Sequence, residues 1–449
     1  MKRRLVRISA GVVGIGIVAV LGSYLATVLL GNMGGDAAAK LNEPINQGLI
    51  DRGAYLAVLG DCAACHTAPQ GQKFAGGLPI ATPIGAVYTT NITPDKTTGI
   101  GNYSFGDFER AVRRGIRPDG TSLYPAMPFP SYARISDADI QALYAYFSKG
   151  VRPIVNTDKA PQITWPLSMR WPLTYWRWLF GPTLQTSSMA WSGEAQLDRG
   201  AYLVEGLGHC GTCHTPRGLA LQEKALTSRD GLQYLSGGLV DNQVANSLRG
   251  DAMTGLGSWS EADIVQFLQT GRNSRTAAFG GMSDAVTHST QFMKDEDLQA
   301  IAHFLKSLSP VRNETGFSYQ GAVASALESG NVSARGALDY ANNCSACHLS
   351  GGNGYTETFP ALAGNPVVNA RDPLSLINIV LNGGTVPPTS KAPTHFTMPS
   401  FGDRLRDQEV ADILTFIRSS WGNSAPPVDA SMVARVRQVT GAPATAREE

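Results

Sequence analysis

The sequence CAACH at residues 62–66 recurs as CGTCH at residues 210–214 and as CSACH at residues 344–348. These stretches contain every cysteine of the chain, namely Cys62, Cys65, Cys210, Cys213, Cys344 and Cys347. In each stretch the two thiols are about one helical turn apart and a histidine follows at once. This spacing is typical of haem c attachment, in which both thiols bind one haem and the imidazole binds its iron.

A single stretch of this kind could instead be a thiol redox pair or half of a zinc site. Three copies on one chain, with no cysteine left over, favour haem over both alternatives and exclude three disulfides. We therefore expect three covalently bound haem c groups, each held by one cysteine pair. We expect His66, His214 and His348 to be iron ligands.

The motifs lie within a longer repeat. The hexamer DRGAYL at residues 51–56 recurs letter for letter at 198–203, and a degraded copy, ARGAL, occupies 334–338. Each copy precedes its motif by a similar distance, so it predicts the first helix of a repeated unit. Its role is expected to be structural.

Two further elements recur after the motifs. Capping-box pairs, Ser104 with Asp107 and Ser260 with Asp263, predict helix starts in the first two units. Each unit then closes on a helix with apolar residues at helical spacing. Those residues are Ile140, Leu143, Tyr144 and Phe147; Leu298, Ile301, Phe304 and Leu305; and Val410, Ile413, Leu414 and Ile417. Because no alternating strand pattern competes, we expect small all-helical units.

The expected fold class is all-α, with three tandem class I cytochrome c domains after an N-terminal membrane anchor or signal segment. The predicted ranges are 1–35 for the anchor or signal segment, 45–184, 190–310 and 334–422 for the three domains, 311–333 for a polar linker and 423–449 for a tail.

The first residues predict export. A positive segment, Lys2 to Arg7, precedes an uncharged run from Ile8 to Leu30. This run is long enough to span a bilayer and longer than a usual signal sequence, which favours a retained anchor over a long cleaved signal. In either case the positive end stays in the cytoplasm and the rest of the chain faces the periplasm.

A methionine later in each unit is the expected second iron ligand. Met127 lies in YPAMP at 124–128, and Met398 lies in TMP at 397–399. The candidates in the second unit are Met253, Met282 and Met293. Met282 lies at the matching place. His/Met ligation fills the iron, so these haems should carry electrons. A haem peroxidase-like enzyme, which needs an open iron, is the alternative.

The other features of the chain offer little catalytic chemistry. The remaining histidines, His209, His288, His303 and His395, are interpreted as surface or core residues. Lys and Arg total 37 against 36 for Asp and Glu, so the net charge of +1 argues against nucleic-acid binding. Neither a catalytic triad nor a nucleotide-binding motif is present in the sequence.

One stretch is rich in aromatic residues. WPLSMRWPLTYWRWLF at residues 165–180 holds four of the seven tryptophans. Trp, Tyr and Arg among Leu and Phe favour a segment that lies at the membrane interface, and we assign residues 163–181 to it. A packed connector between domains is the alternative.

Beyond the haem motifs, several stretches resemble one family. They lie at residues 61–67, 90–95, 99–103, 124–128, 165–170, 209–217 and 359–366. The chain resembles the triheme cytochrome c subunits of the membrane-bound dehydrogenases of acetic acid bacteria, those of quinoprotein alcohol dehydrogenase in particular. The resemblance covers residues 50–440.

This resemblance implies a catalytic partner, either a quinoprotein, a flavoprotein or a molybdoprotein, that oxidises an alcohol, aldehyde or sugar. The chain would then pass electrons through its three haems to ubiquinone at the periplasmic side of the inner membrane. It would not itself oxidise the substrate. A small third subunit is a further candidate partner, and a free-standing periplasmic electron carrier is the remaining alternative.

Overall fold

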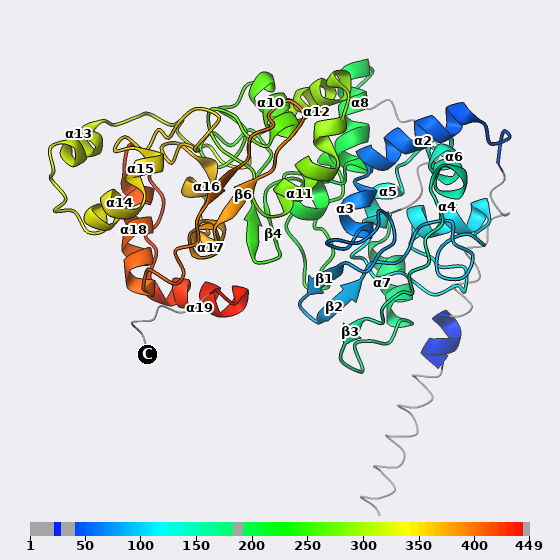
Figure 1. The fold of residues 1–449 in the computed structure, drawn as a ribbon. Helices are drawn as coiled ribbons and strands as arrows, with labels where there is room; N and C mark the ends of the chain where they lie inside the picture. The colour runs from blue at the N-terminus through cyan, green and yellow to red at the C-terminus, as the bar shows by residue number, and fades with distance from the viewer. Residues whose placement is uncertain (1–21, 28–40, 183–191, 443–449) are drawn as a thin grey trace, which may run out of the picture. The chain divides into compact units, whose positions relative to one another are not determined.

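The computed structural model describes residues 22–27, 41–182 and 192–442 (Figure 1). The chain divides into two compact units. One consists of Met1–Leu56 and Cys65–Ser188, and the other of Ala57–Ala64 and Met189–Glu449. Most of the anchor or signal segment predicted over residues 1–35 lies outside the described residues.

Helices and short strands alternate in the first unit. Its elements are α2 (Gln47–Leu59) and α3 (Cys62–His66), which both continue into the second unit, β1 (Pro79–Thr82), β2 (Gly85–Tyr88), α4 (Phe105–Arg114), α5 (Phe129–Tyr132), α6 (Asp137–Ala145), the π-helix η1 (Tyr146–Gly150), β3 (Gln162–Ile163) and α7 (Pro172–Phe180). The strands form one antiparallel sheet in the order β1-β2-β3, with Ile80 opposite Val87 and Gly85 opposite Ile163.

The second compact unit contains the second and third motifs in full. Its elements are α8 (Ala195–Tyr202), η2 (Leu203–Leu207), α9 (Gly211–His214), η3 (Ser228–Asp230), β4 (Gly238–Val240), β5 (Gln243–Ala245), α10 (Glu261–Thr270), α11 (Gly281–His288), η4 (Thr290–Phe292), α12 (Asp295–Ser307), α13 (Ala322–Glu328), α14 (Ala337–Asn343), α15 (Ser345–His348), α16 (Pro366–Asn369), α17 (Leu374–Asn382), β6 (Gly384–Val386), β7 (Phe396–Met398), α18 (Asp407–Ser419) and α19 (Ala430–Thr440). Strands β4 and β5 pair antiparallel, as do β6 and β7.

The repeated hexamer fastens the first helix of each repeat to the closing helix. A Cβ atom on Gly53, Gly200 or Gly336 would clash with a carbonyl oxygen of the closing helix. These oxygens belong to Ala142, Ala300 and Asp412. Only glycine permits so close an approach of two backbones. Helices α8 and α12, which cross at Gly200, lie side by side in Figure 1.

The arginine before each glycine adds an ion pair to this crossing. Arg52 pairs with Asp139 at 2.6 Å, and Arg199 pairs with Asp297 at 2.7 Å. Arg335 pairs with Asp412 at 2.8 Å. The structural role expected for the hexamer is therefore a packing contact together with an ion pair.

Several predicted helix features are confirmed. Ser104 and Ser260 each form a capping box, with Asp107 and Asp263 respectively, at the starts of α4 and α10. The closing helices α12 and α18 bury the apolar residues that the helical spacing identified: Leu298, Ile301, Phe304, Leu305, Val410, Ile413, Leu414 and Ile417. In α6 and η1, Ile140, Leu143 and Phe147 are buried in the same way.

The expected fold class, all-α with three tandem class I domains after an anchor, is wrong. The described residues include seven strands in three antiparallel sheets, and the chain forms two compact units. Among the residues described, helices long and apolar enough to cross a membrane are not found. Strands of two to four residues are too short for an alternating pattern to emerge.

One of these hairpins did leave a sequence signal. Asp241 and Asn242, between β4 and β5, both have positive φ, at 49° and 56°. Two such residues form the two-residue turn that connects hairpin strands, and Asn and Asp favour it. Strands β6 and β7 are separated by a longer irregular segment, which has no comparable local signal.

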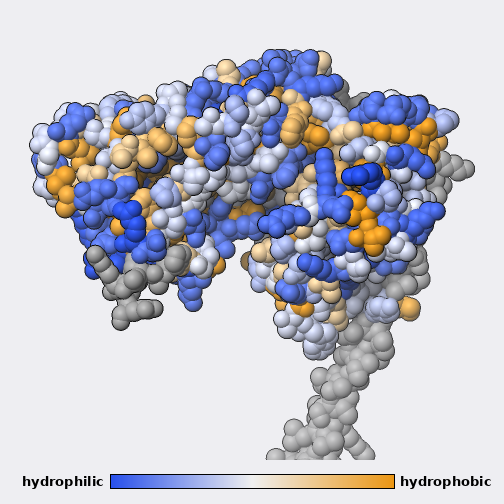
Figure 2. Space-filling view, in the orientation of Figure 1, coloured by the Kyte–Doolittle hydropathy of each residue, from blue (hydrophilic) through white to orange (hydrophobic). Residues whose placement is uncertain are grey.

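The C-terminal residues also differ from a simple tail. Helix α19 is capped by Asp429, whose side chain accepts a hydrogen bond from the Met432 N–H. Val433 and Val436 are buried in the same core as Tyr340 and Trp421. Around these cores the surface in Figure 2 is largely hydrophilic, with separate hydrophobic patches.

Candidate haem sites

Each motif forms one short helical turn that presents its two cysteines together. Cys62 and Cys65 lie in α3, whereas Cys210 and Cys344 directly precede α9 and α15. The N–H of His214 donates to the Cys210 carbonyl at 3.0 Å, and the N–H of His348 donates to the Cys344 carbonyl at 2.9 Å. The backbone is thus helical from first cysteine to histidine, which places both thiols on one face.

The three motif histidines share one hydrogen bond. The Nδ1 of His66 lies 2.7 Å from the Thr90 carbonyl oxygen, that of His214 lies 2.7 Å from Asn246 O, and that of His348 lies 2.9 Å from Pro360 O. Because a carbonyl oxygen only accepts, Nδ1 must carry the proton. The lone pair of each imidazole is then on Nε2, free to bind a metal.

The environment of these rings favours the neutral form. Burial lowers the pKa of His66, His214 and His348 below the ordinary histidine value, against a smaller opposing effect of the carbonyl hydrogen bond. Neutral imidazole is the form that coordinates iron. The sequence carried no sign that Thr90, Asn246 and Pro360 are the acceptors, since a main-chain acceptor can be any residue type.

The pKa values of two motif thiols differ from those of a reactive redox pair. Burial raises the pKa of Cys210 to about 12 and that of Cys344 to about 12. Reactive dithiols have lowered pKa values instead. None of the six cysteines forms a disulfide, and the described residues offer no group of three or more His, Cys, Asp or Glu side chains that could hold a metal ion.

These features fit haem c attached through each motif. Two cysteines one turn apart are followed by an imidazole that a main-chain carbonyl orients through Nδ1, and the arrangement recurs at all three motifs. The donor set at each site is the one that covalent haem requires.

The structure places the candidate methionines in three different settings. Met127 lies in the turn before α5, Met398 ends β7 and Met282 lies in the first turn of α11. All three are partly buried. Met293 is 8% exposed in the apolar core, and the backbone N–H of Met253 donates to Glu314. Met127, Met282 and Met398 stay predicted ligands, and Met253, which is also partly buried, stays a candidate in the second repeat.

The other histidines have separate surroundings. His209 lies beside Cys210 with a positive φ of 37°, and burial lowers its pKa. His303 lies on α12 with its two ring nitrogens at 2.9 Å from Glu261 and 3.0 Å from Glu194. His303 is thus a surface residue in an ion-pair cluster.

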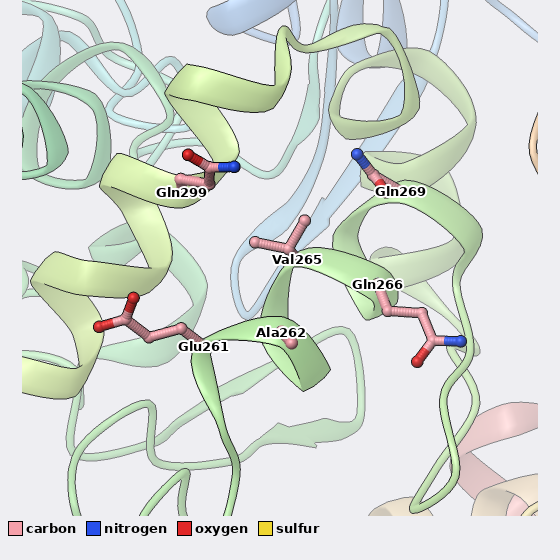
Figure 3. Close-up of a pocket in the computed structure, with 6 residues that line it drawn as sticks. All are labelled: Glu261, Ala262, Val265, Gln266, Gln269 and Gln299. Carbon is pink, nitrogen blue, oxygen red and sulfur yellow. The ribbon is translucent and has the colours of Figure 1, made fainter.

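A surface groove in the second unit offers little for catalysis. It measures about 430 Å³ and is lined by α10 and by Gln299 of α12. Figure 3 shows its side chains: Glu261, Ala262, Val265, Gln266, Gln269 and Gln299. Its single carboxylate, Glu261, is engaged by His303. The other lining side chains are three glutamine amides and the aliphatic Ala262 and Val265, none of which titrates.

Comparison with known proteins agrees with these sites. Residues 333–421 match the family Cytochrome c, around the third motif. An alcohol dehydrogenase (quinone) cytochrome c subunit from Komagataeibacter europaeus is 53% identical over 399 residues, covering 88% of this chain and 85% of the relative. A gluconate 2-dehydrogenase cytochrome c subunit from Pantoea cypripedii is 53% identical over 406 residues, covering 89% and 92%. The chain belongs to the family of dehydrogenase cytochrome c subunits.

A further relative with lower sequence identity also belongs to the family of dehydrogenase cytochrome c subunits. The fructose dehydrogenase cytochrome subunit of Gluconobacter japonicus is 36% identical over 439 residues, covering 92% of this chain and 88% of the relative. The resemblance predicted from the sequence is confirmed. A dehydrogenase cytochrome c subunit carries haem c and transfers electrons, and it works in a complex with a catalytic dehydrogenase.

Proposed function

We propose that this chain binds three haem c groups and carries electrons from a catalytic dehydrogenase subunit to ubiquinone. The supporting observation is the histidine–carbonyl hydrogen bond, which is the same at all three motifs. Bound haem supplies one-electron redox chemistry. The chain's residues hold and orient it: the six motif cysteines, His66, His214 and His348, and as second ligands Met127, Met282 and Met398.

The names of the relatives support a dehydrogenase as the electron donor and a quinone as the electron acceptor. They are cytochrome subunits of alcohol, gluconate and fructose dehydrogenases, and the alcohol dehydrogenase is described as quinone-dependent. The donor to this chain would be a quinoprotein, flavoprotein or molybdoprotein that oxidises an alcohol, aldehyde or sugar. The proposed location is the periplasmic side of the inner membrane.

The aromatic segment of the first unit supports contact with a membrane surface. Trp165, Leu167, Trp178 and Leu179 are all exposed. Tryptophan, whose ring is apolar with one polar N–H, is enriched at membrane interfaces. Residues 163–181 would therefore lie on the bilayer rather than across it.

Contacts behind this segment hold it in place. The Tyr175 hydroxyl donates to the Ser23 carbonyl at 3.0 Å, beside the exposed Tyr24 and Leu25. The Arg170 guanidinium lies 4.5 Å from the centre of the Tyr124 ring and donates to the Ser122 carbonyl. These contacts leave the tryptophan and leucine side chains free to enter the interface.

The number of haems can be tested directly. We expect the mass of the mature chain to include three haems, and His66→Ala, His214→Ala and His348→Ala each to lose the six-coordinate spectrum of one haem. Only two haems in the wild-type protein would contradict the proposal. Carbon monoxide binding to the reduced wild-type protein would indicate an open iron and favour the peroxidase-like alternative.

The donor can be identified on the native membrane complex. Ethanol, acetaldehyde, gluconate or fructose would be added in turn while the reduced haem c absorption band is recorded. Reduction by one substrate would name the partner's substrate class, and extraction of ubiquinone should then leave the haems reduced. Haems reducible by dithionite but by no substrate of the intact complex would contradict the proposed donor.

The membrane contact has its own test. Trp178→Ser with Leu179→Ser should weaken binding of the purified complex to phospholipid vesicles, as measured by flotation. Val155→Ser, which alters another exposed aliphatic side chain of the first unit, is the matched control. Equal flotation of both variants and the wild type would remove residues 163–181 from the membrane contact.

A further inference from the structure

A tight hairpin follows the second motif. Its strands meet at a bridge between Arg217 and Glu223. The Gly218 N–H donates to the Gln222 carbonyl at 2.8 Å, and the Leu221 N–H donates to the Gly218 carbonyl at 3.0 Å. We call residues 216–224 the second-motif hairpin. Its tip, residues 218–221, is a hydrogen-bonded turn.

The tip exposes aliphatic side chains where a turn usually has polar ones. Leu219 is fully exposed, at 106% of its reference area, and Leu221 is 37% exposed. Leu221 also has a positive φ of 61°, a conformation that favours Gly or Asn. Contact with water disfavours an exposed leucine in the free chain, and the turn geometry does not require one. Neither factor explains leucine at these two positions.

Arg217 fixes the hairpin to the haem-attachment motif. Its Nη2 donates to the Thr212 carbonyl, and its Nη1 donates to the Leu221 carbonyl, both at 2.7 Å. Thr212 lies between the two cysteines of the motif, and its hydroxyl donates to Glu223 at 3.4 Å. The apolar tip is therefore held at a fixed place beside the second motif.

The corresponding loops after the other two motifs have no such tip. Gln70 after the first motif has nearly the same backbone angle, with φ of 60°, but its exposed neighbours are Gly71 and Gln72. Residues 350–354 after the third motif are Ser, Gly, Gly, Asn and Gly. The leucines are thus not required by the turn that follows a motif.

We propose that the second-motif hairpin docks the catalytic dehydrogenase subunit, with Leu219 inserted in an apolar pocket of that partner. This inference rests on the proposed function, because electrons must enter close to a haem. A rigid aliphatic tip flanked by polar Gln222 and by charged Arg217 and Lys224 matches an interface with an apolar centre and a polar rim. The hairpin has none of the aromatic residues that favour a membrane surface.

The test uses the full complex carrying Leu219→Asp. Association with the catalytic subunit, measured by sedimentation over a dilution series, should weaken by at least about tenfold. Haem content and haem potentials should be unchanged, because the Leu219 side chain is fully exposed. Leu219→Met, which keeps an apolar tip, should restore association. Leu232→Asp, at an exposed leucine outside the hairpin, is the matched control.

The outcomes separate the docking site from the proposed function. A wild-type complex whose haems are reduced by substrate, with Leu219→Asp associating equally well, would overturn the docking site alone. Wild-type haems that no catalytic partner reduces would instead overturn the proposed function. An intact Leu219→Asp complex that no longer binds phospholipid vesicles would show that the hairpin faces a bilayer, which also overturns the docking site.

Discussion

The second and third repeats fasten their first and closing helices in related but unequal ways. In both, a glycine lies against a carbonyl oxygen of the closing helix, Ala300 O for Gly200 and Asp412 O for Gly336. In the second repeat the arginine pairs with Asp297, three residues before Ala300. In the third, Asp412 supplies both the carbonyl oxygen and the carboxylate.

This difference separates two kinds of constraint. A backbone contact has a fixed geometry, so the glycine cannot be replaced or moved. A long arginine side chain can reach a carboxylate on either of two successive turns, so its partner can change. The degraded copy of the hexamer keeps Arg335, Gly336 and Ala337, whereas Ala334 and Leu338 replace the aspartate and the tyrosine of the other copies.

Alanine at the crossing glycines should have the largest effect. Gly200→Ala should reduce the free energy of unfolding by about 1–3 kcal/mol, because a methyl group would force α8 away from α12. Gly336→Ala should cost about 1 kcal/mol more, since its φ of 81° is unfavourable for alanine. Urea unfolding of the haem-loaded protein measures both.

Gly316→Ala is the control for these variants, because a Cβ atom there meets nothing within 4 Å. Its midpoint should match that of the wild type. If Gly200→Ala and Gly316→Ala unfold at the same urea concentration, the helix crossing is not the constraint described above.

Loss of the arginines should have a smaller and unequal effect. Arg199 makes two bonds to Asp297, at 2.7 and 2.9 Å, and their side chains are 37% and 10% exposed. Arg199→Ala should cost about 1 kcal/mol. Arg335, 72% exposed, makes the weaker contact, so Arg335→Ala should cost about 0.3 kcal/mol. Equal losses in urea unfolding would contradict this order.

The smallest expected effect is a pH dependence of the free energy of unfolding, which arises from His303 in the second repeat. Hydrogen bonds and charge from Glu261, and then from Glu194, raise the pKa of His303 above its ordinary value of 6.5. Its contribution to stability is therefore complete below about pH 6.5 and is lost as the pH rises through the higher folded-state pKa. The matching residue of the third repeat is Thr415, which does not titrate.

His303→Gln should remove this contribution. The difference in urea midpoint between wild type and variant should be greatest in mildly acid buffer and should shrink toward about pH 8.5. A difference that stays constant across this range would show that His303 does not act through protonation.

Local spacing in the sequence predicted several helices correctly. The three motifs, the capping boxes of Ser104 and Ser260 and the apolar faces of the closing helices are all short-range patterns, and each is sufficient to place a helix. The resemblance to dehydrogenase cytochrome c subunits came from short stretches as well, two of which contain the first and second motifs.

The features that the sequence did not predict depend on distant contacts. Thr90, Asn246 and Pro360 act through main-chain oxygens, so their side chains carry no signal. Strands β6 and β7 are joined by a long irregular segment, so their pairing leaves no local pattern in the sequence. Helix α19 had a local signal in Asp429, but its buried Arg437, which donates to the Leu405 carbonyl, obscured the apolar face.

The main-chain acceptors of the motif histidines have a consequence for how this protein can vary. A carboxylate in that role would be lost by one substitution, and the ring would lose its orientation. Here the acceptors belong to a threonine, an asparagine and a proline, three residues with unrelated side chains. Substitution at these positions can therefore alter the surroundings of each motif histidine while the bond that orients its ring is retained.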